Sequence, residues 1–325
     1  MHTKKLRAVA LVAASMLAVI ASGCSGSADG SGGSAGNFKP RGNVTMIVPF
    51  APGGGSDISG RSAAAGLADV SGLTISVKNI EGGSGAVGYS QFLADSGKDN
   101  VLLASETALL ALPLTQKVKF SYQSFTPIMK LGDDYTLIAV RPDAPYKTCK
   151  DLTDAARKKQ ISVAISGKTG LDNVVFSLMA KKTGAKFNKV PFESGAESIT
   201  ALLGGNVQAI SNNPGEIMGQ LKSGKLRALC AASDQRYSNS ELKDIPTAKE
   251  QGIDVSFAQF RGVIAPADIS PKAKAYWIAE AKKFAKSKAY KDYINKNVMQ
   301  AKPLYGDEFT KYLASNNSLL QQAIG

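Results

Sequence analysis

Short runs of apolar residues alternate with longer amphipathic stretches along most of the chain from residue 43 onward. Such runs are typical of buried strands, and the amphipathic stretches are typical of helices that pack on them. We predict strands at 44–48, 73–78, 100–105, 136–140, 161–165, 189–191, 207–210 and 226–231, with helices at 150–159, 174–183 and 194–203. This alternation favours parallel α/β sheets, which bind ligands at the carboxyl ends of their strands.

The first predicted strand runs into Pro49, Pro52 and three consecutive glycines at 53–55, and a helix start follows. Ser56 or Asp57 can cap that helix. A turn of this kind leaves backbone N–H groups unpaired beside the positive end of a helix, where a carboxylate or phosphate is favoured. The pattern therefore predicts an anion cradle, and the alternative is a tight strand-to-helix turn with no ligand.

The N-terminus indicates the compartment. Lys4, Lys5 and Arg7 precede an apolar run at 8–21, which is too short to span a bilayer and fits a signal-peptide core. The run ends in Ala21-Ser22-Gly23-Cys24, which resembles the lipobox of bacterial lipoproteins. We expect a signal peptide at 1–23, a lipidated Cys24 with a Ser/Gly tether at 24–42, and an extracytoplasmic, membrane-anchored protein. An ordinary secretory signal with an incidental cysteine is the alternative.

The amino-acid composition limits the kinds of catalysis, metal site and ligand that are possible. The only histidine, His2, lies in the predicted signal, so the mature chain lacks Ser-His-Asp and Cys-His catalysis and imidazole metal sites. Cys149 and Cys230 are too few for a thiolate zinc site; an extracytoplasmic setting allows them to pair, but we favour free, buried side chains. The net charge is +13, and removal of Lys4, Lys5 and Arg7 leaves +10, which attracts anions. Scattered lysines and few aromatics argue against nucleic acid.

Three short motifs point to enzymes, and each fails on inspection. Residues 83–88 fit the dinucleotide pattern G-x-G-x-x-G, with Glu106 as the ribose partner, but a lone match in a glycine-rich chain is weak. Residues 166–169 look like the end of a P-loop, yet Ser162 stands where the first glycine is required. Motifs of penicillin-recognising enzymes occur only in reversed order. We therefore expect no enzyme, no cofactor and no metal.

Loops that carry glycine or hydroxyl groups follow the predicted strands. They lie at 52–57, 82–85, 105–107, 166–170, 193–196 and 212–215. In a two-lobed α/β protein such loops converge on one cleft, which backbone N–H, hydroxyl and amide donors then dominate. A cleft of this kind suits holding an oxyanion and does not suit breaking bonds.

The segment VPFAPGGGSDISGR resembles the opening signature of the solute receptors of tripartite tricarboxylate transporters, the Bug-type periplasmic binding proteins. The similarity continues through SVKNIEGGSGAVG and KVPFESGAESITALLGGNVQAISNNPGE to GVIAPADISP. It implies a two-lobed α/β fold, the type II periplasmic-binding fold or Venus flytrap, in which each lobe is a sheet flanked by helices. Lobe 1 would hold 43–141 plus 232–325 and lobe 2 would hold 142–231, with hinge strands at 136–140 and 226–231.

The resemblance also implies a function. The protein, a monomer, would close on a small organic carboxylate and deliver it to a permease of large and small integral-membrane subunits. A receptor that reports to a signalling partner, or a secreted enzyme on the same architecture, is the alternative.

Site residues follow from the same resemblance. Lobe 1 would contribute Phe50, Ala51, Gly53, Gly54, Ser56, Asp57, Ser105 and Thr107, and lobe 2 would contribute Ser166, Thr169, Phe192, Ser194, and Asn212 or Asn213. We favour Asp57 as a helix cap paired with Arg61 over a ligand contact. Lys168 and Arg261 are the cations best placed to neutralise further carboxylates, unless each is a solvated surface charge.

The chain departs from relatives inside the predicted pocket. Glu193 stands where relatives often carry lysine, and Phe260-Arg261 replaces a frequent tryptophan. Together with Glu106 on the other rim, Glu193 argues against citrate and leaves room for a ligand that carries an amino group.

Overall fold

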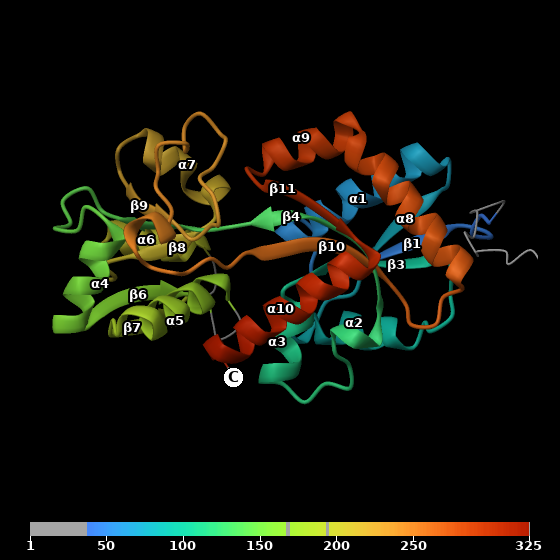
Figure 1. Ribbon diagram of the computed structural model, residues 1–325, viewed down its shortest axis with the longest axis horizontal. Coiled ribbons are helices and arrows are strands. Elements are labelled where there is room, and N and C mark those ends of the chain that lie inside the picture. The colour runs from blue at the N-terminus through green and yellow to red at the C-terminus, as the bar shows by residue number, and fades with distance from the viewer. Residues whose placement is uncertain (1–37, 167–169, 193–194, 325) are drawn as a thin grey trace, which may run out of the picture. The chain divides into compact units, whose positions relative to one another are not determined.

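The computed structural model describes residues 38–166, 170–192 and 195–324 (Figure 1). The predicted signal peptide, Cys24 and most of the tether lie outside the described residues, as do Lys168, Thr169, Glu193 and Ser194. Among the helices of the described ranges, none is long and apolar enough to cross a bilayer.

A six-stranded mixed sheet has the order β11-β4-β10-β3-β1-β2. Strands β1 (Val44–Val48), β2 (Ile75–Asn79) and β3 (Val101–Glu106) run parallel and agree with the predicted strands to within a few residues. The antiparallel strands β4 (Thr126–Asp134), β10 (Gln259–Ala265) and β11 (Gln300–Tyr305) were not predicted. The apolar pattern did not predict β4 and β10 because both strands bury charged residues, including Lys130 and Arg261, which interrupt that pattern.

Helices cover both faces of this sheet, and successive strand residues serve opposite faces. Met46 and Leu102 pack with α1 (Gly55–Ser71), α8 (Pro271–Lys286) and α9 (Lys288–Lys296). Ile47 and Leu103 belong to the cluster of α2 (Ala86–Leu93), α3 (Ala108–Thr115) and α10 (Gly306–Ile324). At the α1–α8 contact a Cβ on Gly66 would lie 2.0 Å from the Phe284 ring, so only glycine allows this approach.

A second group of strands follows β4 along the chain. β8 (Ile210–Asn212), β5 (Leu137–Val140) and β9 (Arg227–Ala231) form an antiparallel sheet, and β6 (Ile161–Ile165) pairs parallel with β7 (Phe187–Pro191). A bridge between Val163 and Ala209 joins the two sheets. The helices of this region, α4 (Cys149–Lys158), α5 (Leu171–Thr183) and α6 (Gly195–Leu203), lie near their predicted positions, and α7 (Pro214–Lys222) precedes β9.

The chain passes twice between the two groups of strands. The first passage is direct, because β4 ends at Asp134 and β5 begins at Leu137. The second runs through 232–258, a segment that hydrogen-bonds to β9: Ala231 N–H donates to Pro246 O at 2.9 Å and Ala248 N–H donates to Ala231 O at 2.8 Å. These contacts hold 246–248 beside β9, while the exact limits of the two lobes stay a prediction.

Cys149 and Cys230 form a disulfide, so the preference for free side chains was wrong. Their Cα atoms lie 5.8 Å apart although the residues are 81 positions apart in sequence, and both side chains are fully buried. The bond joins the start of α4 to β9. The contact that brings these two elements together is tertiary, and neither local sequence reveals it.

Candidate functional site

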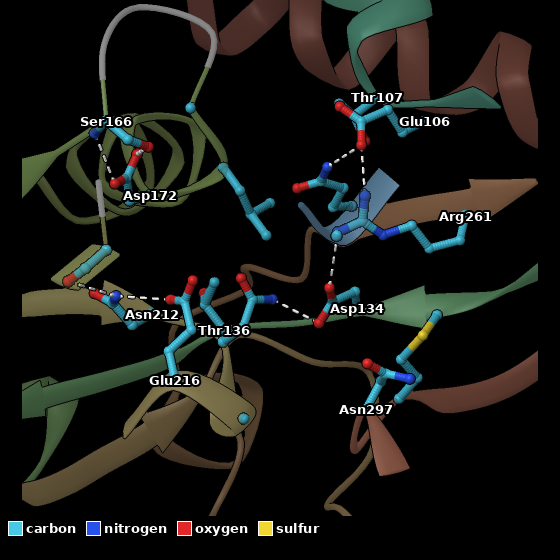
Figure 2. A pocket seen from close by; sticks show the side chains of 18 of the residues that line it. Glu106, Thr107, Asp134, Thr136, Ser166, Asp172, Asn212, Glu216, Arg261 and Asn297 are labelled. Carbon is cyan, nitrogen blue, oxygen red and sulfur yellow. Dashed lines mark hydrogen bonds and ion pairs between the residues drawn. The ribbon is translucent and has the colours of Figure 1, made fainter. Parts of the chain in front are cut away.

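A cavity of about 560 Å³ lies at the ends of strands from both sheet groups (Figure 2). Glu106 and Thr107 line it at the end of β3, and Asp134 lines it at the end of β4. Asp172 and Glu216 line it from the first turns of α5 and α7. The cavity therefore gathers the carboxyl ends of strands and the starts of helices, as expected for an α/β ligand site.

The glycine turn between β1 and α1 already holds an anion, and that anion is the side chain of Asp57. Gly53 N–H and Arg61 Nε both donate to Asp57 Oδ2 at 2.9 Å, and Asn79 Nδ2 donates to Asp57 Oδ1 at 2.9 Å. The Arg61 bond, with the other donors, lowers the pKa of Asp57 to about 2. The predicted pairing with Arg61 is confirmed, but the residue that caps α1 is Gly54, not Ser56 or Asp57.

Arg261 is buried at the centre of the site and shared between two carboxylates (Figure 2). Its Nη1 donates to Glu106 Oε2, and its Nη2 donates to Asp134 Oδ2 at 3.3 Å. Burial alone would lower the pKa of Arg261, but the two carboxylates outweigh it and the pKa is raised. The alternative of a solvated surface charge is therefore wrong, while a role of the guanidinium in neutralising a ligand carboxylate stays a prediction.

Two neighbours fix this arrangement. Ser56 Oγ donates to Glu106 Oε2, and Gln259 Nε2 donates to the same oxygen at 2.8 Å. A Cβ on Gly55 would lie 2.8 Å from Arg261 Nη2, so the absent side chain at the start of α1 makes room for the guanidinium. The β1–α1 turn thus reaches the cavity through Gly55, Ser56 and Arg261.

The opposite wall carries carboxylates that no cation of the described residues pairs with. Asp172 accepts hydrogen bonds from Ser166 N–H at 2.7 Å, Ser166 Oγ at 3.0 Å and Asn173 N–H at 2.7 Å. Burial, assisted by the nearby charge of Glu216, raises the pKa of Asp172. Glu216 Oε2 accepts from Asn212 Nδ2 at 2.9 Å. Within the described part of the chain, neither carboxylate forms an ion pair.

Asp134 connects the two walls. Asn213 Nδ2 donates to its Oδ1 at 2.6 Å, while Arg261 holds its Oδ2. Burial raises the pKa of Asp134 despite the guanidinium, and Glu216 adds to the effect. Three carboxylates from three elements therefore interact electrostatically across the cavity.

Thr107 is 6% exposed, begins α3 and lines the cavity. Its Oγ1 has no hydrogen-bond partner among the described residues. Ser105 lies beneath it and contacts the Tyr89 hydroxyl at 3.2 Å, away from the cavity lining.

Six predicted site residues line the cavity: Phe50, Thr107, Ser166, Asn212, Asn213 and Arg261. The lining does not include Ala51, Gly53, Gly54, Ser56, Asp57 or Ser105, and Phe192 lines a separate cavity of about 410 Å³. Lys168, Thr169 and Ser194 lie outside the described residues. Which of these residues contact a ligand stays a prediction.

Sequence reasoning missed Asp134, Asp172 and Glu216. Asp172 and Glu216 each lie just beyond a predicted loop, in the acidic first turn of a helix. Acidic residues at a helix start are ordinarily interpreted as caps, and only the tertiary structure shows that these face a cavity. No group of three or more His, Cys, Asp or Glu that could hold a metal occurs within 38–166, 170–192 and 195–324.

Comparisons with known proteins agree with this architecture. Residues 60–321 match the model of the family described as tripartite tricarboxylate transporter family receptor. Protein BugT of Bordetella pertussis is 30% identical over 242 residues, covering 70% of this chain and 72% of BugT. A TctC solute-binding protein from Polaromonas, solved without ligand, has a TM-score of 0.80 at 28% identity and covers 88% of this chain and 99% of its own.

A more distant structure shows the fold alone. MatC from Rhodopseudomonas palustris, solved with bound malate, has a TM-score of 0.68 at 19% identity and covers 87% of this chain and 99% of its own. With the Polaromonas structure, this likeness confirms the predicted periplasmic-binding-protein fold.

Proposed function

The chain belongs to the tripartite tricarboxylate transporter receptor family of periplasmic solute-binding proteins, and from this premise we propose that it captures a small organic carboxylate in the cavity. One observation carries the proposal. The cavity is lined by hydroxyl and amide groups of Thr107, Ser166 and Asn212, and it contains no histidine. Such groups bind and orient an oxyanion through hydrogen bonds.

Two further features support a receptor that closes on its ligand. The cavity is lined from both groups of strands, and only Tyr135 and Thr136 separate β4 from β5 at the first passage. A short hinge there, with a second near 257–259, lets ligand select the closed state. The malate-bound relative MatC supports the carboxylate class. Delivery to a large and a small permease subunit follows from the family.

Thermal-shift screening of the purified protein tests this function. Mono-, di- and tricarboxylates, amino acids and aromatic acids are screened, and mass spectrometry identifies any ligand that co-purifies. A ligand at 100 times its Kd stabilises the folded state by about 2.7 kcal/mol and raises the Tm. If every carboxylate leaves the Tm unmoved while a neutral sugar raises it, the proposal is wrong.

Lipid anchoring through Cys24 is a separate part of the proposal. The small residues before Cys24 and the Ser/Gly tether after it support attachment at the outer side of the membrane. Fractionation of cells that express Cys24→Ala should find the protein released from membranes. Persistent attachment of the variant would contradict lipidation at this residue.

A further inference from the structure

The charge of the cavity is opposite in sign to the charge of the chain. The whole chain has a net charge of +13. The described cavity lining nevertheless contains four carboxylates, Glu106, Asp134, Asp172 and Glu216, against two cations, Arg261 and Lys296. A second or third ligand carboxylate would enter a region that already carries excess negative charge, and like charges at close range repel.

The two cations do not offset this excess on the wall formed by α5 and α7. Arg261 is held between Glu106 and Asp134, so its charge is already neutralised. Lys296 is exposed at the end of α9 and forms no ion pair with Asp172 or Glu216. Asp172 and Glu216 therefore face the cavity without a cation from the described residues.

Glu216 is the carboxylate most available to a ligand. It is exposed in the first turn of α7, and among the described residues Asn212 alone donates a hydrogen bond to its side chain. Its charge also disfavours ionisation of Asp134 and Asp172, whose pKa values are both raised. A cation bound beside Glu216 would reduce the electrostatic repulsion between Glu216 and both Asp134 and Asp172.

Thr107 supplies an independent indication of a ligand. Its side chain is buried, lines the same cavity and has no hydrogen-bond partner for Oγ1 among the described residues. Buried hydroxyl groups are normally paired, so an orphan that faces a cavity indicates a missing partner. Thr107 also begins α3, and the positive end of a helix favours a carboxylate.

We propose that the ligand is a carboxylate that also carries a protonated amine, with its ammonium group beside Glu216 and Asp172 and its carboxylate toward Thr107. This inference rests on the proposed function and narrows its substrate class. An ammonium group offers three donors and a positive charge to Asp172 and Glu216, which no cation of residues 38–166, 170–192 and 195–324 pairs with. The carboxylate accepts the hydrogen bond that Thr107 Oγ1 has to offer.

Isothermal titration with matched acids tests the amine directly. The pairs are glutamate with glutarate, aspartate with succinate, and γ-aminobutyrate with butyrate. In at least one pair the amine-bearing acid should bind ten-fold tighter or more, and Glu216→Gln should remove most of that preference. Glu308→Gln is the matched control, because Glu308 is also an exposed glutamate in the first turn of a helix but does not line the cavity.

Variants of Thr107 test the other end of the ligand. Thr107→Val should weaken binding of both members of a pair about equally, and Thr107→Ser should retain it. A loss that Thr107→Ser shares in full would contradict the hydrogen bond. An unchanged Tm of Glu216→Gln and Thr107→Val without ligand separates binding from folding.

The outcomes separate a failure of the amine-bearing ligand from a failure of the proposed carboxylate receptor. If succinate, glutarate or butyrate binds as tightly as its amine-bearing partner in every pair that binds, the amine is wrong and the carboxylate receptor stands. If the amine preference survives Glu216→Gln unchanged, the assigned position of the ammonium group is wrong. If no acid of any pair binds while another carboxylate of the thermal-shift screen raises the Tm, the amine is wrong and the receptor stands; if no carboxylate of that screen raises the Tm, the proposed function itself fails.

Discussion

The starts of helices α1 and α5 carry aspartates whose electrostatic surroundings differ. Each follows a parallel strand, and each places an aspartate in the first turn of the helix, Asp57 in α1 and Asp172 in α5. Both aspartates accept a backbone N–H from the preceding turn. Asp57 also binds Arg61 and has a pKa of about 2, whereas Asp172 forms no ion pair with a residue of 38–166, 170–192 or 195–324 and has a raised pKa.

The difference shows why a glycine-rich turn need not be a ligand site. The β1–α1 turn has the stronger anion-binding signature in sequence, yet its own Asp57 occupies it and faces away from the cavity lining. Asp172, at the start of α5, lies on the cavity wall, and no described residue pairs with its charge. A ligand site is therefore indicated by a charge that the protein's own side chains do not neutralise. Backbone geometry alone does not reveal such a charge.

The largest expected effect comes from the Cys149–Cys230 disulfide. It joins α4 to β9, which belong to the same group of elements as β6 and α5. Replacing Cys149 and Cys230 by serine opens a loop of 81 residues and should cost about 2–4 kcal/mol of unfolding free energy. Hydrogen exchange should show faster opening of β6 and α5 than of β1 and α1. Cys24→Ser is the control, since Cys24 lies outside the bond, and equal loss of protection in both turns would contradict this regional effect.

The next largest effect is expected at the self-occupied turn. Asp57→Ala removes the acceptor of Gly53 N–H, Asn79 and Arg61 together, and it should lower the unfolding free energy by about 1.5–3 kcal/mol because hydrogen bonds to a buried, charged carboxylate are lost. Urea unfolding measures the change. Asp69→Ala, an exposed aspartate on the same helix, should change stability little. Equal losses in the two variants would show that the Asp57 contacts contribute nothing specific.

The sequence predicted the strands whose neighbours are apolar and missed those whose stability depends on paired charges. β1 and β6 are continuous apolar runs, so the pattern identified their bounds. β4 buries Lys130 and Asp133, which a 2.6 Å ion pair between them makes tolerable. A pattern of single residues does not show which side chains will neutralise a charge, so no strand was predicted at β4.

The same limit explains the candidate site. The predicted loops 166–170 and 212–215 end just before Asp172 and Glu216, so the cleft was located correctly along the chain while its charge was not. Arg261 was predicted as a ligand's charge partner, but Glu106 and Asp134 already hold it. Charges that are 100 or more residues apart, such as Asp134 and Arg261 at a separation of 127, meet only in the fold.

A third prediction asks whether the β1–α1 turn acts on the cavity through Arg261. Gly55→Ala places a Cβ against the guanidinium and should displace it from Glu106 and Asp134, weakening binding of any carboxylate about ten-fold, or about 1.4 kcal/mol. Gly54→Ala should leave binding unchanged, because the nearest atom to its Cβ is 3.9 Å away. Titration of both variants with one ligand measures the difference. Equal ligand affinities of Gly55→Ala and Gly54→Ala would show that the β1–α1 turn does not influence binding in the cavity.

The smallest expected effect is a difference in pH dependence between the two aspartates. The pKa of Asp57 is lowered from 3.8 to about 2, so its stabilisation is complete above pH 3.8 and is lost as the pH falls toward 2. The pKa of Asp172 is raised above 3.8, so its ionisation costs stability at neutral pH, and acidification toward 3.8 relieves that cost.

Urea unfolding of the wild type, Asp57→Asn and Asp172→Asn at pH 7, 5 and 4 separates the two signs. The deficit of Asp57→Asn should stay constant across this range, because its charged form persists throughout. Asp172→Asn should become less stable relative to the wild type as the pH falls, since the wild type alone gains from protonation of Asp172. If the stability of both variants relative to the wild type changes in the same direction between pH 7 and 4, Asp57 and Asp172 are in similar electrostatic surroundings. The wall at α5 would then no longer support a bound ammonium group.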